Sequence, residues 1–316
     1  MRVENLVYSL EATMPVFLLM IAGMLFRRMG LFSEAFTRGA NAFVFRIALP
    51  VSLFVQLSGV EILSVWDTGF VLFCAGATVL SILLALLIAR LTVKEEVRGE
   101  FVQASYRSSA SLLGMAYMEN LYGEASMGSL MMVGSVPIYN IAAVLILSFL
   151  KPGGGKMQKG QFVRVLKGVV TNPIILGIVF GCIASLLPFS MPHIVSKALS
   201  DIGKTATPLG LMAMGAQVEF KSVRSRAGSA VLASVMKLMV FAVLFLPAAV
   251  ALGFRREKLI AVMVMLGSAT TVAGYIMAKN MGHEGTLTQT TVMLTTLLSS
   301  FTMTFWIYLM RTLGYL

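Results

Sequence analysis

Two apolar segments carry hydroxyl and small side chains where a membrane helix is normally uniformly apolar. They run from Ser109 to Gly123 and from Ser268 to Gly282, and corresponding residues are 159 positions apart. Hydroxyl groups that can donate neutral hydrogen bonds stand near the start of both segments: Ser109, Ser111, Ser268, Thr270 and Thr271. An interrupted helix adds free backbone N–H groups with a partial positive charge. These groups together suit a carboxylate, so we predict an organic-anion site at these interruptions.

Glycine and proline indicate where the helices are irregular. Gly114 and Gly274 permit unusual backbone conformations, and we expect unwinding centred on both. Pro50 and Pro208, which are 158 residues apart, mark two further hinge positions in apolar segments. Asn140 is a membrane-embedded amide, and we place it with both glycines among the substrate-binding residues.

Charged residues inside apolar segments are costly and are functional by default. Arg46 lies near the middle of its segment, and we predict that it attracts the anion. For three other cations inside such segments we favour snorkelling or structural pairing: Arg107, Lys204 and Lys237. Glu119 and Asp201 are the acidic candidates for ion coupling.

Other kinds of chemistry have no residues to support them. Two histidines and two cysteines lie far apart in the sequence, so we expect no metal site, disulfide or histidine-activated nucleophile. No G-x-S-x-G or H-E-x-x-H motif occurs, and we predict neither an enzyme nor a cofactor. The net charge of +11 comes from basic residues between apolar segments, which favours a membrane topology over nucleic acid binding.

The elements that must position these residues are membrane helices. Hydrophobic residues make up 58% of the 316 residues, charged residues 12%, and the mean hydropathy is +0.87. A soluble domain carries about a quarter charged residues. Since a spanning helix needs about 20 apolar residues, ten spans are predicted, at about 7–27, 38–58, 67–90, 100–121, 127–150, 166–187, 193–217, 227–251, 258–280 and 286–311.

A polar linker divides these spans into two sets of five. We predict a first repeat at 1–150, a cytoplasmic linker at 151–165, and a second repeat at 166–316, which is inverted because five spans precede it. We predict a multi-pass protein of the cell membrane, which is the inner membrane of a bacterium. Loops rich in Lys and Arg are placed on its cytoplasmic side, so both termini are placed on the outer side. A basic cluster at 255–258 contradicts this rule, because its loop is placed outside.

Several stretches resemble the auxin efflux carrier family of secondary transporters, in particular bacterial members described as malate or malonate permeases. They are Asn41–Pro50, Arg107–Gly123, Val136–Asn140, Ala206–Leu209 and Ala278–Gly282. The resemblance implies an all-α membrane protein of ten spans in two inverted repeats, similar to bile-acid symporters, with interrupted spans four and nine crossing. Spans one, two, six and seven would form a scaffold, and the others a transport unit that moves as an elevator.

The resemblance also implies transport of an organic anion by alternating access. Many relatives carry a proline at each crossing, at positions that are Ala116 and Ala269 here, and we keep both as hinge positions. The alternative function is a ligand-gated pore or a membrane sensor that uses the same cavity. Coupling to protons, to sodium or to neither stays open, and so does the oligomeric state, with a homodimer as one option. The remaining partners are the organic anion and the lipid bilayer.

Overall fold

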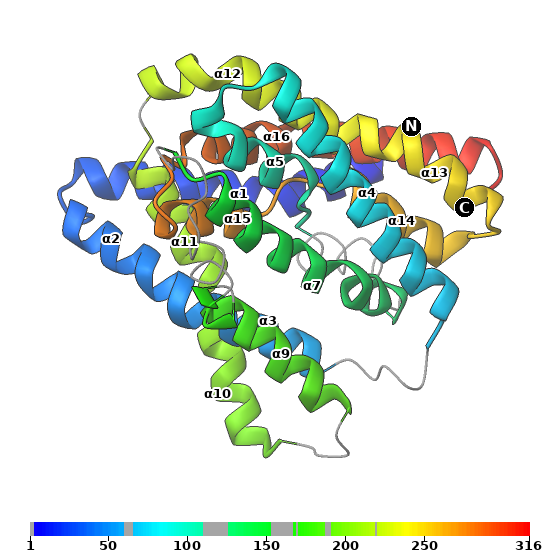
Figure 1. The fold of residues 1–316 in the computed structure, drawn as a ribbon, viewed down its shortest axis with the longest axis horizontal. Coiled ribbons are helices and arrows are strands. Elements are labelled where there is room, and N and C mark those ends of the chain that lie inside the picture. The colour runs from blue at the N-terminus through cyan, green and yellow to red at the C-terminus, as the bar shows by residue number, and fades with distance from the viewer. Residues whose placement is uncertain are drawn as a thin grey trace.

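The computed structural model describes residues 3–59, 66–109, 126–152, 167–168, 170–186, 191–218 and 220–316, and every regular element there is a helix (Figure 1). The first half contains α1 (Val3–Arg28), α2 (Glu34–Phe43), the π-helix η1 (Val44–Ala48), α3 (Leu49–Ser58), α4 (Thr68–Thr92), the 3₁₀ turn η2 (Glu95–Val97), α5 (Arg98–Tyr106) and α7 (Ser126–Phe149). The second half contains α9 (Pro173–Leu186), α10 (His193–Lys204), α11 (Ala206–Ala216), α12 (Phe220–Val235), the π-helix η4 (Met236–Val240), α13 (Phe241–Ala251), α14 (Arg256–Gly267), α15 (Val272–Asn280) and α16 (Thr286–Thr312). The all-helical prediction is confirmed.

Six helical stretches among the described residues are long and apolar enough to cross a membrane. They are Glu34–Ser58, Thr68–Thr92, Met127–Phe149, Arg224–Ala251, Arg256–Asn280 and Thr286–Thr312. Each coincides within a few residues with a predicted span. Helices α1 and α9 lie in the predicted first and sixth spans, and α10 and α11 share the seventh. These are the lengths and compositions of a multi-pass membrane protein.

Glycines bring α1, α3, α9, α10 and α11 into close backbone contact, and with α2 we call these helices the scaffold group. A Cβ added to Gly23 of α1 would stand 2.0 Å from the Met212 carbonyl oxygen of α11. A Cβ on Gly181 of α9 would stand 3.0 Å from the Phe54 carbonyl oxygen of α3. Gly181 follows Gly23, and Met212 follows Phe54, by 158 positions. The same backbone contact, which only a small residue allows, therefore occurs twice in the chain.

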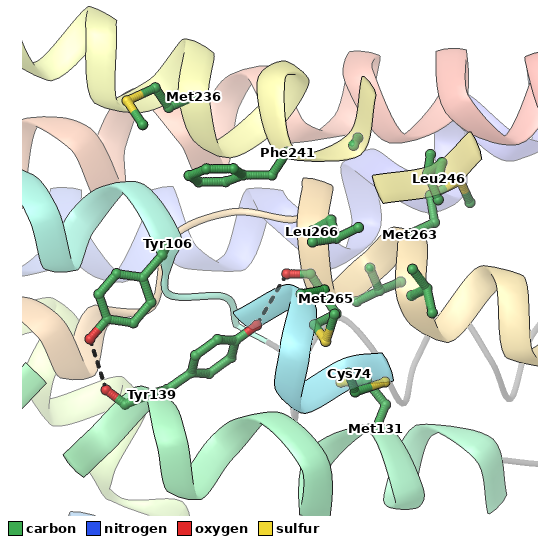
Figure 2. Close-up of a cluster of buried hydrophobic side chains, with 14 of the residues drawn as sticks. Cys74, Tyr106, Met131, Tyr139, Met236, Phe241, Leu246, Met263, Met265 and Leu266 are labelled. Carbon is green, nitrogen blue, oxygen red and sulfur yellow. Dashed lines mark hydrogen bonds between the residues drawn. The ribbon is translucent and has the colours of Figure 1, made fainter. Parts of the chain in front are cut away.

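The largest apolar cluster takes its buried members from α4, α5, α7, α12, η4, α13, α14, α16 and the turns beside them. We call these elements the core group and count α15 with them, because it follows α14 directly and contacts α5 and α16. Figure 2 shows part of this cluster, where Phe241 and Leu246 of α13 approach side chains of α14. Two smaller clusters join the groups, one of them containing Met20 of α1 and Ile276 of α15. The chain thus forms two packed groups of helices that meet along α7, α15 and α16.

Ion pairs connect several turns at one end of the molecule. Arg226 of α12 lies 3.8 Å from the Glu96 carboxylate in the α4–α5 turn and 3.0 Å from the Glu284 carboxylate before α16.

In Figure 1 both chain termini lie at the side away from the α1–α2 turn. This arrangement places the first loop and the two ends of the chain on different sides of the helices.

The basic cluster at 255–258, which contradicts the charge rule, is engaged in local contacts. Lys258 forms an ion pair with Asp67, the N-cap of α4, and this hydrogen bond lowers the pKa of Asp67 below its ordinary value. The Arg255 guanidinium lies 4.8 Å from the centre of the Tyr315 ring and donates to the carbonyl oxygens of Val250 in α13 and Phe254 in the turn after it. The basic residues of this cluster thus bind neighbouring side chains and carbonyl groups, and the side of the membrane on which they lie stays a prediction.

Candidate functional site

Two of the predicted interruptions are present, and neither uses proline within the described residues. Helix α5 ends at Tyr106 and gives way to a non-helical stretch at 107–109. Helix α14 ends at Gly267, and residues 268–271 are non-helical before α15 begins at Val272. The predicted hinge position Ala269 lies in this second break. Four predicted residues of the first segment lie outside the described residues: Ser111, Gly114, Ala116 and Glu119.

The prediction that the second break centres on Gly274 is wrong. Gly274 lies inside α15, and its carbonyl oxygen accepts a 2.9 Å hydrogen bond from the Gln103 side chain of α5. A Cβ at this position would stand 3.4 Å from the Gln103 Oε1 atom. The glycine therefore lets α5 approach α15 closely, and the backbone there needs no unwinding.

The two breaks touch each other. The Ser109 backbone N–H donates to the Ala269 carbonyl oxygen at 2.9 Å. The hydroxyls of Ser108 and Ser268 lie 2.6 Å apart, and Ser108 also donates to the Val264 carbonyl oxygen of α14 at 3.0 Å. These bonds satisfy backbone groups that a break leaves free inside the membrane, and they hold the two breaks together. We call this junction of residues 107–109 and 268–271 the crossing.

Side chains from neighbouring helices hold the second break in place. The Thr270 backbone N–H donates to Thr295 of α16 at 3.0 Å, and the Thr270 hydroxyl donates to the Ala104 carbonyl oxygen of α5 at 2.7 Å. Thr271 caps α15 by accepting from the Ala273 N–H at 3.3 Å. Ser268 and Thr270 are buried and bonded to protein, so both hydroxyls hold the crossing together. Neither residue lines the cavity beside it, and their predicted contact with a carboxylate stays a prediction.

Replacing Thr270 by valine should lower the melting temperature of the purified protein. The change keeps the side-chain shape but leaves the Ala104 carbonyl oxygen without its donor, which costs about 1–3 kcal/mol and lowers the melting temperature by about 2–8 °C. Thr302→Val is the matched control, because that half-buried threonine donates only to carbonyl oxygens within α16. Equal melting temperatures for the two variants in a fluorescence-detected unfolding assay would contradict the assigned role.

A cavity of about 90 Å³ lies beside the crossing, between the scaffold group and the core group. Its polar lining consists of Ser52, Gln56, Arg107, Ser108, Ser109, Tyr139, Asn140, Thr207 and Thr271. The N-terminal residues of α15, Val272 and Ala273, also line it, so the positive end of that helix faces the same space. The predicted ligands Ser109, Asn140 and Thr271 therefore come together here.

Arg107 is the dominant charge in this lining, and only 2% of its surface is exposed. Its guanidinium donates to the Asn140 Oδ1 atom at 2.8 Å, with weaker partners in Gln103 Oε1 at 3.5 Å and the Met277 sulfur. Its Nε atom has no partner, and none of the ion pairs found in the described ranges includes it. A buried cation with a free donor beside a cavity is ready to receive an anion.

Arg46 does not line this cavity, so the cavity gives no support to its predicted role, which stays a prediction. It is exposed, and it lies in a separate groove between α3 and α9, beside Phe180. Val44, which is fully buried, occupies the cavity-facing side of η1. Residues two positions apart on a helix point in nearly opposite directions, and Arg46 is consequently directed outward.

The remaining predicted residues lie outside the crossing. Pro50 stands in the first turn of α3, and that segment stays helical from Glu34 to Ser58, so Pro50 interrupts nothing. Pro208 follows the junction of α10 and α11 at Thr205. Asp201 is exposed on α10, where it pairs with Lys197 at 3.3 Å. An exposed pair of this kind gives no support to the predicted coupling role.

A polar row on α5 was not recognised as a unit from the sequence. Glu100 is fully buried and accepts hydrogen bonds from the Gly285 N–H and the Thr288 N–H at the start of α16, at 2.8 and 3.1 Å. Gln103 and Arg107 follow on the same helical face, because residues three and seven positions apart align on an α-helix. The spacing of these three residues could have predicted the row from the sequence. It indicates that α5 and the residue after it carry the polar side chains that lie next to the crossing.

The family model described as "Membrane transport protein" matches residues 8–307. The chain belongs to this family. It is the auxin efflux carrier family, so the identification made from the sequence motifs is confirmed. As a member of the auxin efflux carrier family, the protein is a multi-pass membrane transporter and not an enzyme.

Two curated relatives align with most of the chain. An uncharacterized transporter of Methanocaldococcus jannaschii is 21% identical over 240 residues, which cover 73% of this chain and 76% of that protein. A protein of Rhizobium meliloti named "Putative malonate transporter" is 23% identical over 286 residues, which cover 86% of each chain. Both similarities are distant.

Proposed function

We propose that the protein is a secondary carrier for a small organic anion, and that a short dicarboxylate such as malonate is its substrate. The observation that carries this proposal is the buried guanidinium of Arg107 beside the cavity at the crossing. A cation in a membrane interior is costly, and Arg107 has no ion pair within the described ranges. An anionic ligand would supply the opposite charge. The name of the Rhizobium meliloti relative supports malonate as the first compound to test.

The lining of the cavity suits a carboxylate ligand. One carboxylate would accept from the free Nε of Arg107, and the hydroxyls of Ser109 and Thr271 lie in the same lining. The N-terminal end of α15 adds a partial positive charge. Ser52 and Gln56 supply polar groups from α3 for a second carboxylate. A cavity of about 90 Å³ favours a small substrate over a bulky one.

We further propose that the ten predicted spans form two inverted five-helix repeats with a fold similar to that of bile-acid symporters. The backbone contact that occurs twice, between Gly23 and Met212 and between Gly181 and Phe54, supports this arrangement. The contact between the two interrupted segments supports it as well, because Ser109 meets the residue next to its own counterpart, Ser268.

Transport would follow from movement of the core group against the scaffold group. Each group is tightly packed internally, through the large apolar cluster in one and the close glycine contacts in the other. Between the groups lie the two smaller apolar clusters and a few polar contacts, such as that of the Asn280 amide with the Asn41 carbonyl oxygen at 3.3 Å. Such contacts exchange at low cost when one body slides past another.

A cross-link between the groups should stop transport. In a background without Cys74 and Cys182, the pair Asn41→Cys and Asn280→Cys joins α2 to α15 when treated with a short thiol cross-linker. We expect uptake to fall at least about tenfold and to recover on reduction, because the core group can no longer slide along the scaffold. The control pair Arg226→Cys and Glu284→Cys lies within the core group and should keep its uptake. Full uptake by the cross-linked first pair would contradict the elevator mechanism.

The function is tested by uptake of labelled malonate into proteoliposomes. A carrier gives saturable uptake. The uptake of labelled malonate accelerates when unlabelled malonate is preloaded inside the vesicles, because the same binding site faces the two sides of the membrane in turn. A pore or sensor gives neither saturation nor counterflow. Absence of saturable transport for malonate, malate and indole acids alike would overturn the proposal.

A further inference from the structure

Lys237 is one of the largest fully buried side chains of the protein. It lies in η4, the π-helical turn between α12 and α13, and its Nζ atom donates to the carbonyl oxygens of Met265 and Leu266 at 3.1 and 2.8 Å. Over the described parts of the chain, no ion pair includes Lys237. An ammonium group buried within a membrane protein needs negative charge nearby, and within the ranges that the structure describes no acidic side chain provides it.

The negative charge comes from the end of a half-helix. Met265 and Leu266 belong to the last turn of α14, which ends at Gly267 where the break begins. The last carbonyl groups of a helix lack internal partners and together carry about half a negative charge. Ser108 donates to the Val264 carbonyl oxygen, so Lys237 covers the next two. The ammonium therefore sits on the helix end that faces the crossing.

One side chain separates this ammonium from the cavity. Tyr139 of α7, which lines the cavity, donates its hydroxyl to the Met265 carbonyl oxygen at 3.3 Å, as Figure 2 shows. Lys237, which lies in η4, donates to that same oxygen. All of these elements belong to the core group. The charge would therefore travel with the substrate site during transport.

We propose that Lys237 is a built-in cation that occupies the place of a coupling sodium ion at the C-terminal end of α14. In transporters with interrupted helices, the C-terminal ends of half-helices and nearby free carbonyls coordinate the coupling cation. Here the ammonium already binds those carbonyls, so transport needs no sodium at this position. The inference rests on the proposed carrier function and assigns one of its properties, the independence from a sodium gradient.

Ion binding tests the inference separately from transport. The melting temperatures of wild type, Lys237→Ala and the control Lys204→Ala, whose lysine is exposed on α10, are measured in chloride salts of choline, sodium and methylammonium. We expect wild type and Lys204→Ala to be indifferent to the cation. Lys237→Ala opens a carbonyl-lined vacancy, and sodium or methylammonium should raise its melting temperature by about 2 °C or more over choline.

Transport supplies the second test, with labelled malonate in proteoliposomes. Wild-type uptake should stay within twofold when sodium is replaced by choline on both sides of the membrane. Uptake by Lys237→Ala should fall at least about tenfold in choline and recover at least threefold in sodium or methylammonium, while Lys237→Arg should retain activity because it keeps the charge.

Several results would overturn the inference. Sodium-dependent uptake by the wild type is one, and it can be measured even if Lys237→Ala does not fold. Another is a Lys237→Ala protein whose stability and uptake are the same in all three salts. If no anion is transported by any variant, the proposed function fails, yet the melting temperatures still decide whether this helix end binds a cation.

Discussion

Replacing Arg107 by glutamine should lower malonate uptake at least about 100-fold. Glutamine keeps a polar group but removes the cation that faces the cavity, and losing one partner of a buried charged hydrogen bond costs about 2–5 kcal/mol. A cost of about 2.7 kcal/mol corresponds to a factor of about 100. The initial rate of uptake at low malonate concentration, where binding limits the rate, is the measurement.

Two further variants test whether the loss of uptake is specific to the charge of Arg107. Arg107→Lys should retain partial uptake, because it keeps the charge but loses the planar pair of donors. Arg46→Gln should behave as wild type, because that arginine lies in the outer groove. If Arg107→Gln transports within twofold of wild type while folding normally, the cavity at the crossing is not where the anion binds. If Arg46→Gln loses uptake instead, the outer groove is the better candidate.

Replacing Gly23 by alanine should produce the largest loss of stability among single-methyl additions. The new Cβ would stand 2.0 Å from the Met212 carbonyl oxygen, a distance that forces α1 and α11 apart. Overpacking of this kind costs about 1–3 kcal/mol or more, so we expect the melting temperature to fall by about 5 °C or more. Fluorescence-detected unfolding and gel filtration in detergent report it.

A graded series makes this test specific. Gly181→Ala should have a smaller effect, because its Cβ would stand 3.0 Å from the Phe54 carbonyl oxygen. Gly76→Ala is the control, since nothing lies within 4 Å of a Cβ there, and alanine favours the helix. Equal melting temperatures for Gly23→Ala and Gly76→Ala would show that α1 and α11 are not held at this distance.

The spans were largely accessible from the sequence. Membrane helices are long apolar stretches bounded by polar turns, and this local signal located Thr68–Thr92 and Thr286–Thr312 within a few residues. The bend between α10 and α11 and the two π-helical turns η1 and η4 were less accessible. They depend on how a segment packs against its neighbours, which a single-sequence pattern does not contain.

The site was accessible only in part. The interrupted segments could be found, because hydroxyl residues in an apolar stretch need partners. The choice between Arg46 and Arg107 could not be made from depth in the membrane alone. It depends on which side of its helix each residue occupies and on what packs there: Val44 faces the cavity in span two, and Arg107 faces it from the break after α5. The roles of Ser268 and Thr270 likewise depend on partners in α5, α14 and α16.

The break at residues 268–271 has a consequence for the cost of ordering the chain. Ser268 has φ −80° and ψ 169°, a conformation that residues before a proline also adopt. Proline would fix this shape by restricting the unfolded chain, whereas Ala269 leaves the unfolded chain its freedom. Here the entropy is lost on folding and is offset by the hydrogen bonds from Ser109, Thr270 and Ser108. The same crossing can thus be stabilised either by the restricted backbone of a proline or by hydrogen bonds between the segments. This protein uses the hydrogen bonds.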